Sequence, residues 1–330
     1  MVILRYLKHR LKRGRAGMKS TIKWLAILLL IPARWTVGGE VKRPKILGVA
    51  HMAFYVSDLQ KTRAFYKDLL GFEEPFSLKG KNGADRIAFI KVNDYQYIEL
   101  FAELAKQDGQ LNHIAFYTDD ARKMREYLAS RGVAVPDTVG KGQTGNFNYT
   151  IKDPDGHTVE IVEYQPDSWT AREKGKRMPE GRISTHIAHV GVLVGSLEPS
   201  MKLYRDILGF GEFWRGSSSG RVLDWVNMRV PDGEDYLELM LYSKLPPPEK
   251  RGGKNHLCLV VPDVEKAVAT INARPARKDY DKPIEVRVGT NRKRQANLFD
   301  PDGTRIELME PKTIDGMPTP SSTAPVPTSE

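Results

Sequence analysis

Hydrophobic and polar positions follow one pattern four times along the chain. Each time a short apolar strand precedes a segment with apolar residues at helical spacing, and two or three further strand-like segments follow. In the first helical segment these positions include Leu59, Phe65 and Leu69, and Gly71 is the residue expected to end the helix. The pattern predicts four βαβββ units of about 50–60 residues each.

Sequence identity between the segments supports a repeat. Residues 49–72 (VAHMAFYVSDLQKTRAFYKDLLGF) align without a gap with residues 187–210 (IAHVGVLVGSLEPSMKLYRDILGF), and nine of 24 positions are identical. Residues 111–120 (LNHIAFYTDD) match residues 254–263 (KNHLCLVVPD), and each of these is followed by an Asp-Pro-Asp-Gly turn before the last strand. One unit is too small to bury a sheet face alone, so the units should pair. The sequence leaves open which unit pairs with which.

The predicted fold class is α+β, with four βαβββ units in two paired domains whose curled mixed sheets surround concavities. We expect these domains at residues 46–165 and 183–310, joined by a polar linker at residues 166–182. Residues 1–45 form a basic leader. Residues 311–330, rich in Pro, Ser and Thr, are expected to be a disordered tail.

The distribution of charge changes the meaning of the net charge of +10. Residues 1–45 contain twelve Lys or Arg and one acid, so this leader carries +11 and the rest of the chain carries −1. We therefore expect no nucleic-acid partner. The single cysteine, Cys258, excludes a disulfide framework and a Cys-rich zinc site, and its apolar strand predicts an inert buried thiol.

The leader also contains a pattern typical of export. Lys19 and Lys23 precede an apolar run, Trp24–Ile31, which has the length of a signal-peptide core and is too short to span a bilayer. We expect an exported protein, periplasmic or secreted. The alternatives are membrane contact through an uncleaved N-terminal anchor, or a cytoplasmic location if Met1–Ala33 is not a functional signal.

Histidine and glutamate recur at equivalent positions of the four units. Each first strand carries one His and each last strand carries one Glu flanked by large apolar residues. A buried carboxylate in such a strand needs a compensating partner, and a cation shared by carboxylates and imidazoles is the simplest one. Two imidazoles and two carboxylates suit a divalent ion such as Ni, Zn, Mn, Fe or Co. The candidate metal ligands are His51, Glu99, His113, Glu160, His189, Glu238, His256 and Glu307.

The remaining candidates are weaker. His157 follows a turn and is expected to be exposed, and His186 should lie on the opposite face of its strand from His189. Asn112 and Asn255 precede two of the candidate ligands and could orient them. The chain has no Gly-rich phosphate loop and no Ser nucleophile elbow.

These motifs resemble the vicinal oxygen chelate superfamily, which includes glyoxalase I, extradiol dioxygenases, and fosfomycin and bleomycin resistance proteins. The resemblance rests on the strand histidines, on the helix endings FYKDLLGF and LYRDILGF, and on the DPDG-x-x-[VI]-E endings, and it covers residues 46–310. It implies paired βαβββ units whose sheets curl around a metal-binding concavity.

Within the superfamily, the order His, Glu, His, Glu is similar to bacterial glyoxalase I. The resemblance implies one site in each half of the chain and a metal-dependent lyase or isomerase reaction on a small oxygenated substrate. A ligand carboxylate then moves the proton, and Glu160 and Glu307 are the predicted bases. Tyr55 and Glu103 stand where that enzyme has an Arg and an Asn that hold glutathione, so we expect a reaction without glutathione.

Two other functions stay open. Extradiol dioxygenases have the same four-unit length, but the His and Tyr that they carry before the final Glu are missing from residues 289–306. A non-catalytic binding protein of the resistance type, or an interaction protein that inherited the fold, would tolerate vacant ligand positions, and none of the eight is vacant. In every case the expected partner is a small molecule.

Overall fold

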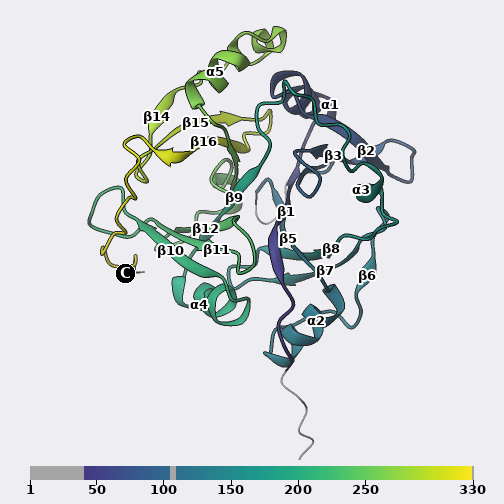
Figure 1. The fold of residues 1–330 in the computed structure, drawn as a ribbon, viewed down its shortest axis with the longest axis vertical. Coiled ribbons are helices and arrows are strands. Elements are labelled where there is room, and N and C mark those ends of the chain that lie inside the picture. The colour runs from purple at the N-terminus through teal and green to yellow at the C-terminus, as the bar shows by residue number, and fades with distance from the viewer. Residues whose placement is uncertain (1–40, 105–108, 329–330) are drawn as a thin grey trace, which may run out of the picture. The chain divides into compact units, whose positions relative to one another are not determined.

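The computed structural model describes residues 41–104 and 109–328, in which two eight-stranded sheets pack beside short helices (Figure 1). The apolar run of the leader and the predicted export signal lie outside the described residues. Within the described ranges, the structure contains no helix of the length and apolar character needed to cross a bilayer.

The first two units build one eight-stranded sheet, in the order β2-β3-β4-β1-β5-β8-β7-β6. At its centre β1 and β5 run antiparallel, and each is flanked on its other side by a parallel strand, β4 or β8. The strands are β1 (Ile46–Tyr55), β2 (Glu73–Lys79), β3 (Asp85–Lys91), β4 (Tyr97–Phe101), β5 (Leu111–Thr118), β6 (Gly140–Lys141), β7 (Phe147–Lys152) and β8 (Thr158–Glu163). The helices are α1 (Leu59–Ala64), its π-helical continuation η1 (Phe65–Leu69), α2 (Ala121–Ser130) and α3 (Trp169–Arg172).

The third and fourth units repeat this arrangement in the order β10-β11-β12-β9-β13-β16-β15-β14. The strands are β9 (Ile187–Val194), β10 (Gly211–Gly216), β11 (Trp225–Arg229), β12 (Tyr236–Leu241), β13 (His256–Val260), β14 (Val286–Val288), β15 (Lys293–Phe299) and β16 (Arg305–Thr313). The helices are α4 (Leu197–Met201), η2 (Lys202–Ile207), η3 (Pro248–Lys250), α5 (Val264–Asn272) and η4 (Pro275–Asp279). We call the two halves the first and second modules. The predicted α+β fold with two curled mixed sheets is confirmed, and the structure pairs consecutive units within each sheet.

Local sequence explains where the first helix begins and ends. Asp58 caps α1, because its carboxylate accepts hydrogen bonds from the backbone amides of Gln60 and Lys61. The predicted glycine Gly71 follows η1 with a φ of 79°, and Gly209 ends the equivalent helix of the second module with a φ of 81°. The π-helical turns η1 and η2 were not predicted, since their apolar spacing resembles that of an α-helix.

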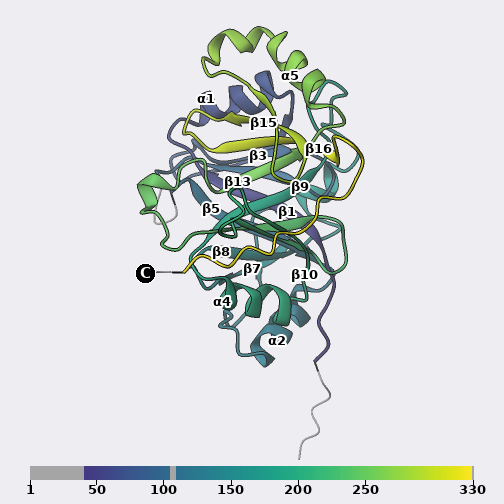
Figure 2. The same ribbon diagram turned by 90° about the vertical axis from the view of Figure 1, so that its left-hand side faces the viewer.

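The two modules share one hydrophobic core. The rings of Phe116 and Phe210 pack edge to face with centroids 5.1 Å apart, and the Tyr127 hydroxyl donates to the backbone oxygen of Ile207. Figures 1 and 2 show α2 beside α4 at one end of the molecule and α1 with α5 at the other. Each helix pair therefore contains one helix from each module, and neither sheet is covered by its own helices alone.

The Asp-Pro-Asp-Gly turns reinforce this junction. Asp155 of the first turn accepts a hydrogen bond of 2.9 Å from the amide of Gly195, and Asp302 of the second accepts one of 3.1 Å from the amide of Ser57. His157, expected to be exposed, is buried here with its Nε2 2.7 Å from the backbone oxygen of Leu193. The prediction was wrong because the turn lies against the other module and does not face solvent.

The segments expected to be a polar linker and a disordered tail contact the sheets. In the linker, the backbone oxygens of Glu173 and Lys176 accept hydrogen bonds from the buried ammonium group of Lys91 on β3. In the tail, β16 extends to Thr313, Ser322 donates its amide to Arg215 on β10, and the backbone oxygen of Pro325 accepts from Leu223. In the structure, backbone hydrogen bonds therefore join the segment for which the sequence predicted disorder to the second module, although this segment has little apolar surface.

One buried carboxyl at the module junction makes stability depend on pH. Asp300 begins the second Asp-Pro-Asp-Gly turn and is fully buried; its Oδ1 accepts from the Thr304 amide, whereas its Oδ2 has no partner. Burial raises the pKa of Asp300 to about 7. Because the folded state favours the neutral acid, Asp300 makes a contribution to stability that is fully present below about pH 4. This contribution is lost as the pH rises through about 7.

The variant Asp300→Asn should remove this loss, because its amide stays neutral. We expect its free energy of unfolding to exceed that of the wild type by about 2–4 kcal/mol at pH 8, with the difference shrinking towards pH 4. Urea titrations at both pH values check this. A difference that is the same at pH 4 and pH 8 would show that Asp300 does not carry the pH dependence.

Candidate metal centre

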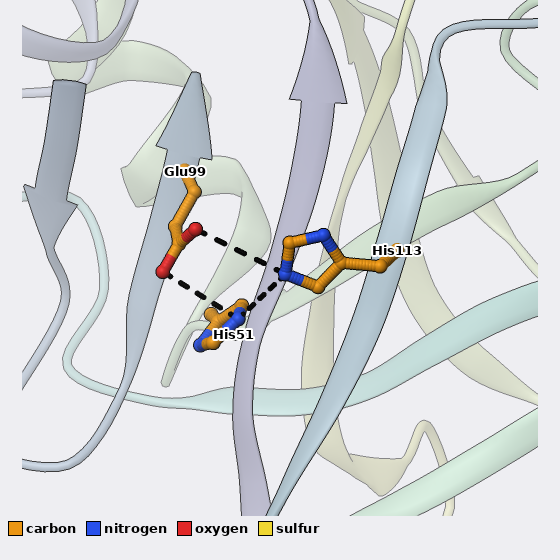
Figure 3. Close-up of side chains that lie close together, drawn as sticks. All are labelled: His51, Glu99 and His113. Atoms are coloured by element: carbon orange, nitrogen blue, oxygen red, sulfur yellow. Dashed lines mark hydrogen bonds and ion pairs between the residues drawn. The ribbon is translucent and has the colours of Figure 1, made fainter. Parts of the chain in front are cut away.

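The first module brings four predicted side chains together on one face of its central strands. His51 on β1, Glu99 on β4, His113 on β5 and Glu160 on β8 are all buried, each with 8% or less of its surface exposed. The strand register explains this, because Ala53 of β1 pairs with both Glu99 and His113. Figure 3 shows the two imidazoles and the Glu99 carboxylate converging on one point. We call these four residues the first quartet.

Distances within the first quartet match those between ligands of one ion. The two Nε2 atoms of His51 and His113 lie 2.8 Å apart, and Glu160 Oε2 lies 3.4 and 3.0 Å from them. The oxygens of Glu99 lie 3.5 Å from His51 Nε2 and 3.9 Å from His113 Nε2. Ligands about 2.1 Å from a tetrahedral or octahedral ion are themselves about 3.0–3.4 Å apart when adjacent. The donor set and the spacing therefore fit a divalent cation.

Burial and charge act against each other in the first quartet. Burial opposes ionisation of Glu160, but hydrogen bonds from His113 and His51 outweigh it and lower the pKa of this carboxyl. Burial raises the pKa of Glu99. The pKa of His51 is raised, because the carboxylates of Glu99 and Glu160 outweigh the effect of burial on the imidazole. The quartet thus attracts positive charge, which a divalent cation supplies.

Two asparagines fix the orientation of first-quartet ligands. Asn112 Oδ1 lies 2.8 Å from Nδ1 of His113 and accepts a hydrogen bond from it, which turns the ring so that Nε2 points into the quartet. Asn148 on β7 donates a hydrogen bond of 2.8 Å to Oε1 of Glu160. Asn112 was among the weak candidates of the sequence analysis. Asn148 was missed, although its place on the strand before the turn would have indicated the same face as Glu160.

The second module assembles the equivalent second quartet, His189, Glu238, His256 and Glu307. The Nε2 atoms of His189 and His256 lie 3.1 Å apart, and Glu307 Oε2 lies 3.4 Å from each. Glu238 Oε1 lies 3.5 Å from His256 Nε2. Burial raises the pKa of Glu238, and in Glu307 hydrogen bonds from both imidazoles outweigh burial and lower it.

An arginine distinguishes the second quartet from the first. Nη2 of Arg305 lies 2.6 Å from Nδ1 of His256, while the backbone oxygen of Lys254 lies 3.1 Å from the same atom. The guanidinium contact is shorter and always donates, so we assign Nδ1 as the acceptor and place the ring proton on Nε2. Burial, together with the charge of Arg305, lowers the pKa of His256 to about 3. The second quartet therefore fits a cation less well than the first.

The weaker candidates of the sequence, His186, Asn255 and Cys258, lie outside or beside the quartets. His186 pairs with Asp235 through a contact of 2.7 Å and lies outside both quartets. Asn255 accepts a hydrogen bond of 3.1 Å from the Leu193 amide. Cys258 is a free buried thiol beside His189 and Glu307, and burial raises its pKa well above the usual value, as expected for an inert thiol.

The cavities in front of the two quartets have different walls. The first cavity, about 150 Å³, has an aromatic wall that includes Phe76, Phe89 and Tyr97, and of the described residues that line it none is Lys or Arg. The second cavity, about 300 Å³, is lined by Trp214, Trp225, Arg287 and Arg305 besides quartet residues. The candidate ligands could be predicted because they recur in the sequence repeat. The residues of these walls differ between the modules, so the repeat does not predict them.

Comparison with known protein families shows to which superfamily the chain belongs. The model of the Glyoxalase/Bleomycin resistance protein/Dioxygenase superfamily matches residues 48–161 and 186–308, so the protein belongs to this superfamily, as the sequence motifs indicated.

Individual relatives come from two branches of this superfamily. A probable lactoylglutathione lyase of Vibrio parahaemolyticus is 27% identical over 124 residues, which are 35% of this chain and 89% of the relative. The Mn(II)-bound glyoxalase of Novosphingobium aromaticivorans superposes with a TM-score of 0.60 at 17% identity, over 81% of this chain and 83% of its own. Homoprotocatechuate 2,3-dioxygenase of Arthrobacter globiformis gives 0.62 at 18%, over 87% of both chains. These structural likenesses establish the fold and leave the reaction open.

Proposed function

We propose that the protein is a divalent-metal-dependent enzyme of glyoxalase-like lyase or isomerase type. Its substrate is a small oxygenated molecule that chelates the metal through neighbouring oxygens and carries no glutathione. The observation that carries this proposal is the buried cluster of His51, Glu99 and His113 at ligand spacing beneath a cavity, with Glu160 within 3.4 Å of both imidazoles. When bound there, a cation such as Mn(II) would stabilise negative charge that develops on a substrate oxygen.

The chain's own residues perform the remaining tasks. His51, His113 and the two carboxylates hold the cation, and the aromatic wall excludes water and orients an apolar part of the substrate. We assign proton transfer to Glu160, whose orientation Asn148 fixes, and to Glu307 as the equivalent residue of the second module. The cavity supports a substrate without glutathione, because no described cationic side chain lines it to meet a glutathione carboxylate.

Exchange of carbon-bound hydrogen tests this function without knowledge of the substrate. We use hydroxyacetone in D₂O as the probe, since a carbonyl next to a hydroxyl can chelate and its adjacent C–H is acidic. Mn(II)-loaded protein should catalyse deuterium incorporation followed by NMR, and a chelator should abolish it. Absence of exchange with each of Ni, Zn, Mn, Fe and Co would contradict the proposed class of reaction.

The variant Glu160→Gln should slow this exchange by about 10²–10⁴-fold, because a carboxamide cannot accept the proton. Metal content is measured in parallel, so that loss of the ion is distinguished from loss of the base. Glu99→Gln is the matched control, since Glu99 is the other carboxylate of the same cavity. A rate that falls in Glu99→Gln and not in Glu160→Gln would transfer the proton-moving role to Glu99.

Extradiol-type dioxygenase chemistry is the second candidate. The aromatic wall of the first cavity favours it, because a cavity of about 150 Å³ has room for a single benzene ring, and the aromatic side chains offer it apolar contact. Oxygen uptake by Fe(II)-loaded protein with catechol, in the absence of hydrogen exchange on hydroxyacetone, would support this function over the first.

A further inference from the structure

Arg305 occupies a position where the two modules differ. In the alignment of the last strands, Thr158 of the first module corresponds to Arg305 of the second, each two residues before the quartet glutamate. Residues two apart on a strand share a face. The second module therefore places a permanent cation on the quartet face, whereas the first module places a hydroxyl there.

Among the described residues, no carboxylate forms an ion pair with the guanidinium of Arg305. Its Nη2 contacts His256 Nδ1 and lies 3.9 Å from the sulfur of Met240, and its buried Nε has no hydrogen-bond partner. The charge of Arg305 acts on Glu238 only at longer range, where it opposes the rise in the pKa of that carboxyl caused by burial. Because no carboxylate bonds the guanidinium directly, this side chain is suited to receive an anion from outside the chain.

A second unpartnered donor belongs to a residue that lines the same cavity. The indole N–H of Trp214 has no hydrogen-bond partner, although Trp214 is only 8% exposed and lines the second cavity with Arg305 and Trp225. Gly216 makes room for this arrangement, because a Cβ there would lie 2.2 Å from a ring atom of Trp214 and 2.9 Å from one of Trp225. Buried indole N–H groups usually have an acceptor, and here a ligand can supply it.

The charges around the cavity favour an anion with an aromatic part. Glu238 and Glu307 also line it, but both carboxylates contact the imidazole of His256 instead of an arginine. Arg287 lines the cavity, and no carboxylate of the described residues forms an ion pair with it. Trp225 and Arg305 also border an adjoining cavity of about 640 Å³, which Lys254 lines as well. The indole faces offer apolar contact next to these cations.

We propose that the cavity of the second module binds an aromatic carboxylate. The ligand's carboxylate accepts from Arg305 and from the indole N–H of Trp214, and its ring lies against Trp225. This site does not depend on a metal ion in the first quartet, so it is independent of the reaction proposed for the first module. The two modules then differ in what they bind: an apolar oxygenated molecule in the first, an organic anion in the second.

Benzoate is the probe that tests the site. Titrations use the full chain in a chelator, so that no metal can bind the carboxylate, and follow the fluorescence of Trp214 and Trp225 together with calorimetry. We expect benzoate to bind at least about tenfold more tightly than benzyl alcohol, which has the ring without the charge. Equal affinities would overturn the carboxylate assignment. Sulfate that binds as tightly as benzoate would overturn the aromatic assignment.

Variants locate the site. Arg305→Met should weaken benzoate binding about tenfold or more, and Trp214→Phe, which removes only the N–H, should weaken it by a smaller factor. Thr158→Met, the equivalent change in the first module, is the matched control and should leave affinity unchanged. Should Arg305→Met fail to fold, Arg305→Lys keeps the charge without the planar fork and should still weaken binding measurably.

Benzoate affinity that survives both Arg305 variants, or that falls in Thr158→Met, would overturn the proposal. The Mn(II) content of the first quartet is measured in the same preparations. Unchanged Mn(II) binding in Arg305→Met separates failure of this site from failure of the metal-dependent function.

Discussion

Replacing His51 and His113 together by alanine is expected to abolish tight metal binding by the protein. Structural zinc sites with four ligands supply roughly 10–16 kcal/mol, and even for a more weakly bound ion the removal of two ligands should lower affinity by about 1000-fold or more. Both imidazoles are buried and point their Nε2 atoms at the same two carboxylates, so no neighbouring side chain can substitute for them. Equilibrium dialysis against Mn(II), read by elemental analysis, measures the loss.

Matched variants make this prediction specific. His186→Ala removes a histidine outside both quartets and should leave Mn(II) affinity unchanged. The pair His189→Ala and His256→Ala should remove only a weaker ion, because the charge of Arg305 beside His256 opposes a cation there. A tight ion that is lost with His189 and His256 but retained without His51 and His113 would reverse the assignment of the two quartets.

The variant Phe116→Ala should destabilise the whole molecule and not the first module alone. Phe116 is 1% exposed and packs on Phe210 across the module junction, so truncation leaves a cavity in the shared core. We expect a loss of about 3–5 kcal/mol in the free energy of unfolding. Because both modules contribute to this core, unfolding should remain a single transition in denaturant and in calorimetry.

Leu104→Ala is the control for that variant. Leu104 is 78% exposed, and its replacement should change stability by no more than about 0.5 kcal/mol. Two separate transitions, of which Phe116→Ala shifts only one, would show that the modules fold independently and that the shared core contributes little.

The quartets could be predicted from the sequence because each unit repeats them in register. His51, His113 and Glu160 recur beside the same apolar neighbours as their counterparts, and strand alternation then places them on one face. The fold class followed from the same repeat. The pairing order of the units could not be predicted from the sequence. Pairing of consecutive units and exchange of units across the chain would bury the same apolar faces.

Features that depend on contacts distant in sequence were missed. His157 is buried because its turn meets the other module, and Ser322 and Pro325 of the predicted tail form backbone hydrogen bonds with the second module. The contact between Arg305 and His256 joins residues 49 positions apart, and it distinguishes two quartets whose sequences look equivalent. Such contacts depend on how the folded elements pack, which local pattern does not encode.

A crystal structure of Mn(II)-soaked protein, with anomalous data collected above the manganese edge, shows directly whether the first quartet holds a metal ion. We expect a strong peak within about 2.0–2.3 Å of His51 Nε2, His113 Nε2 and oxygens of Glu99 and Glu160, and a weaker peak or none at the second quartet. No peak at the first quartet, or a full peak at the second quartet alone, would contradict the assignment of the first quartet as the metal site.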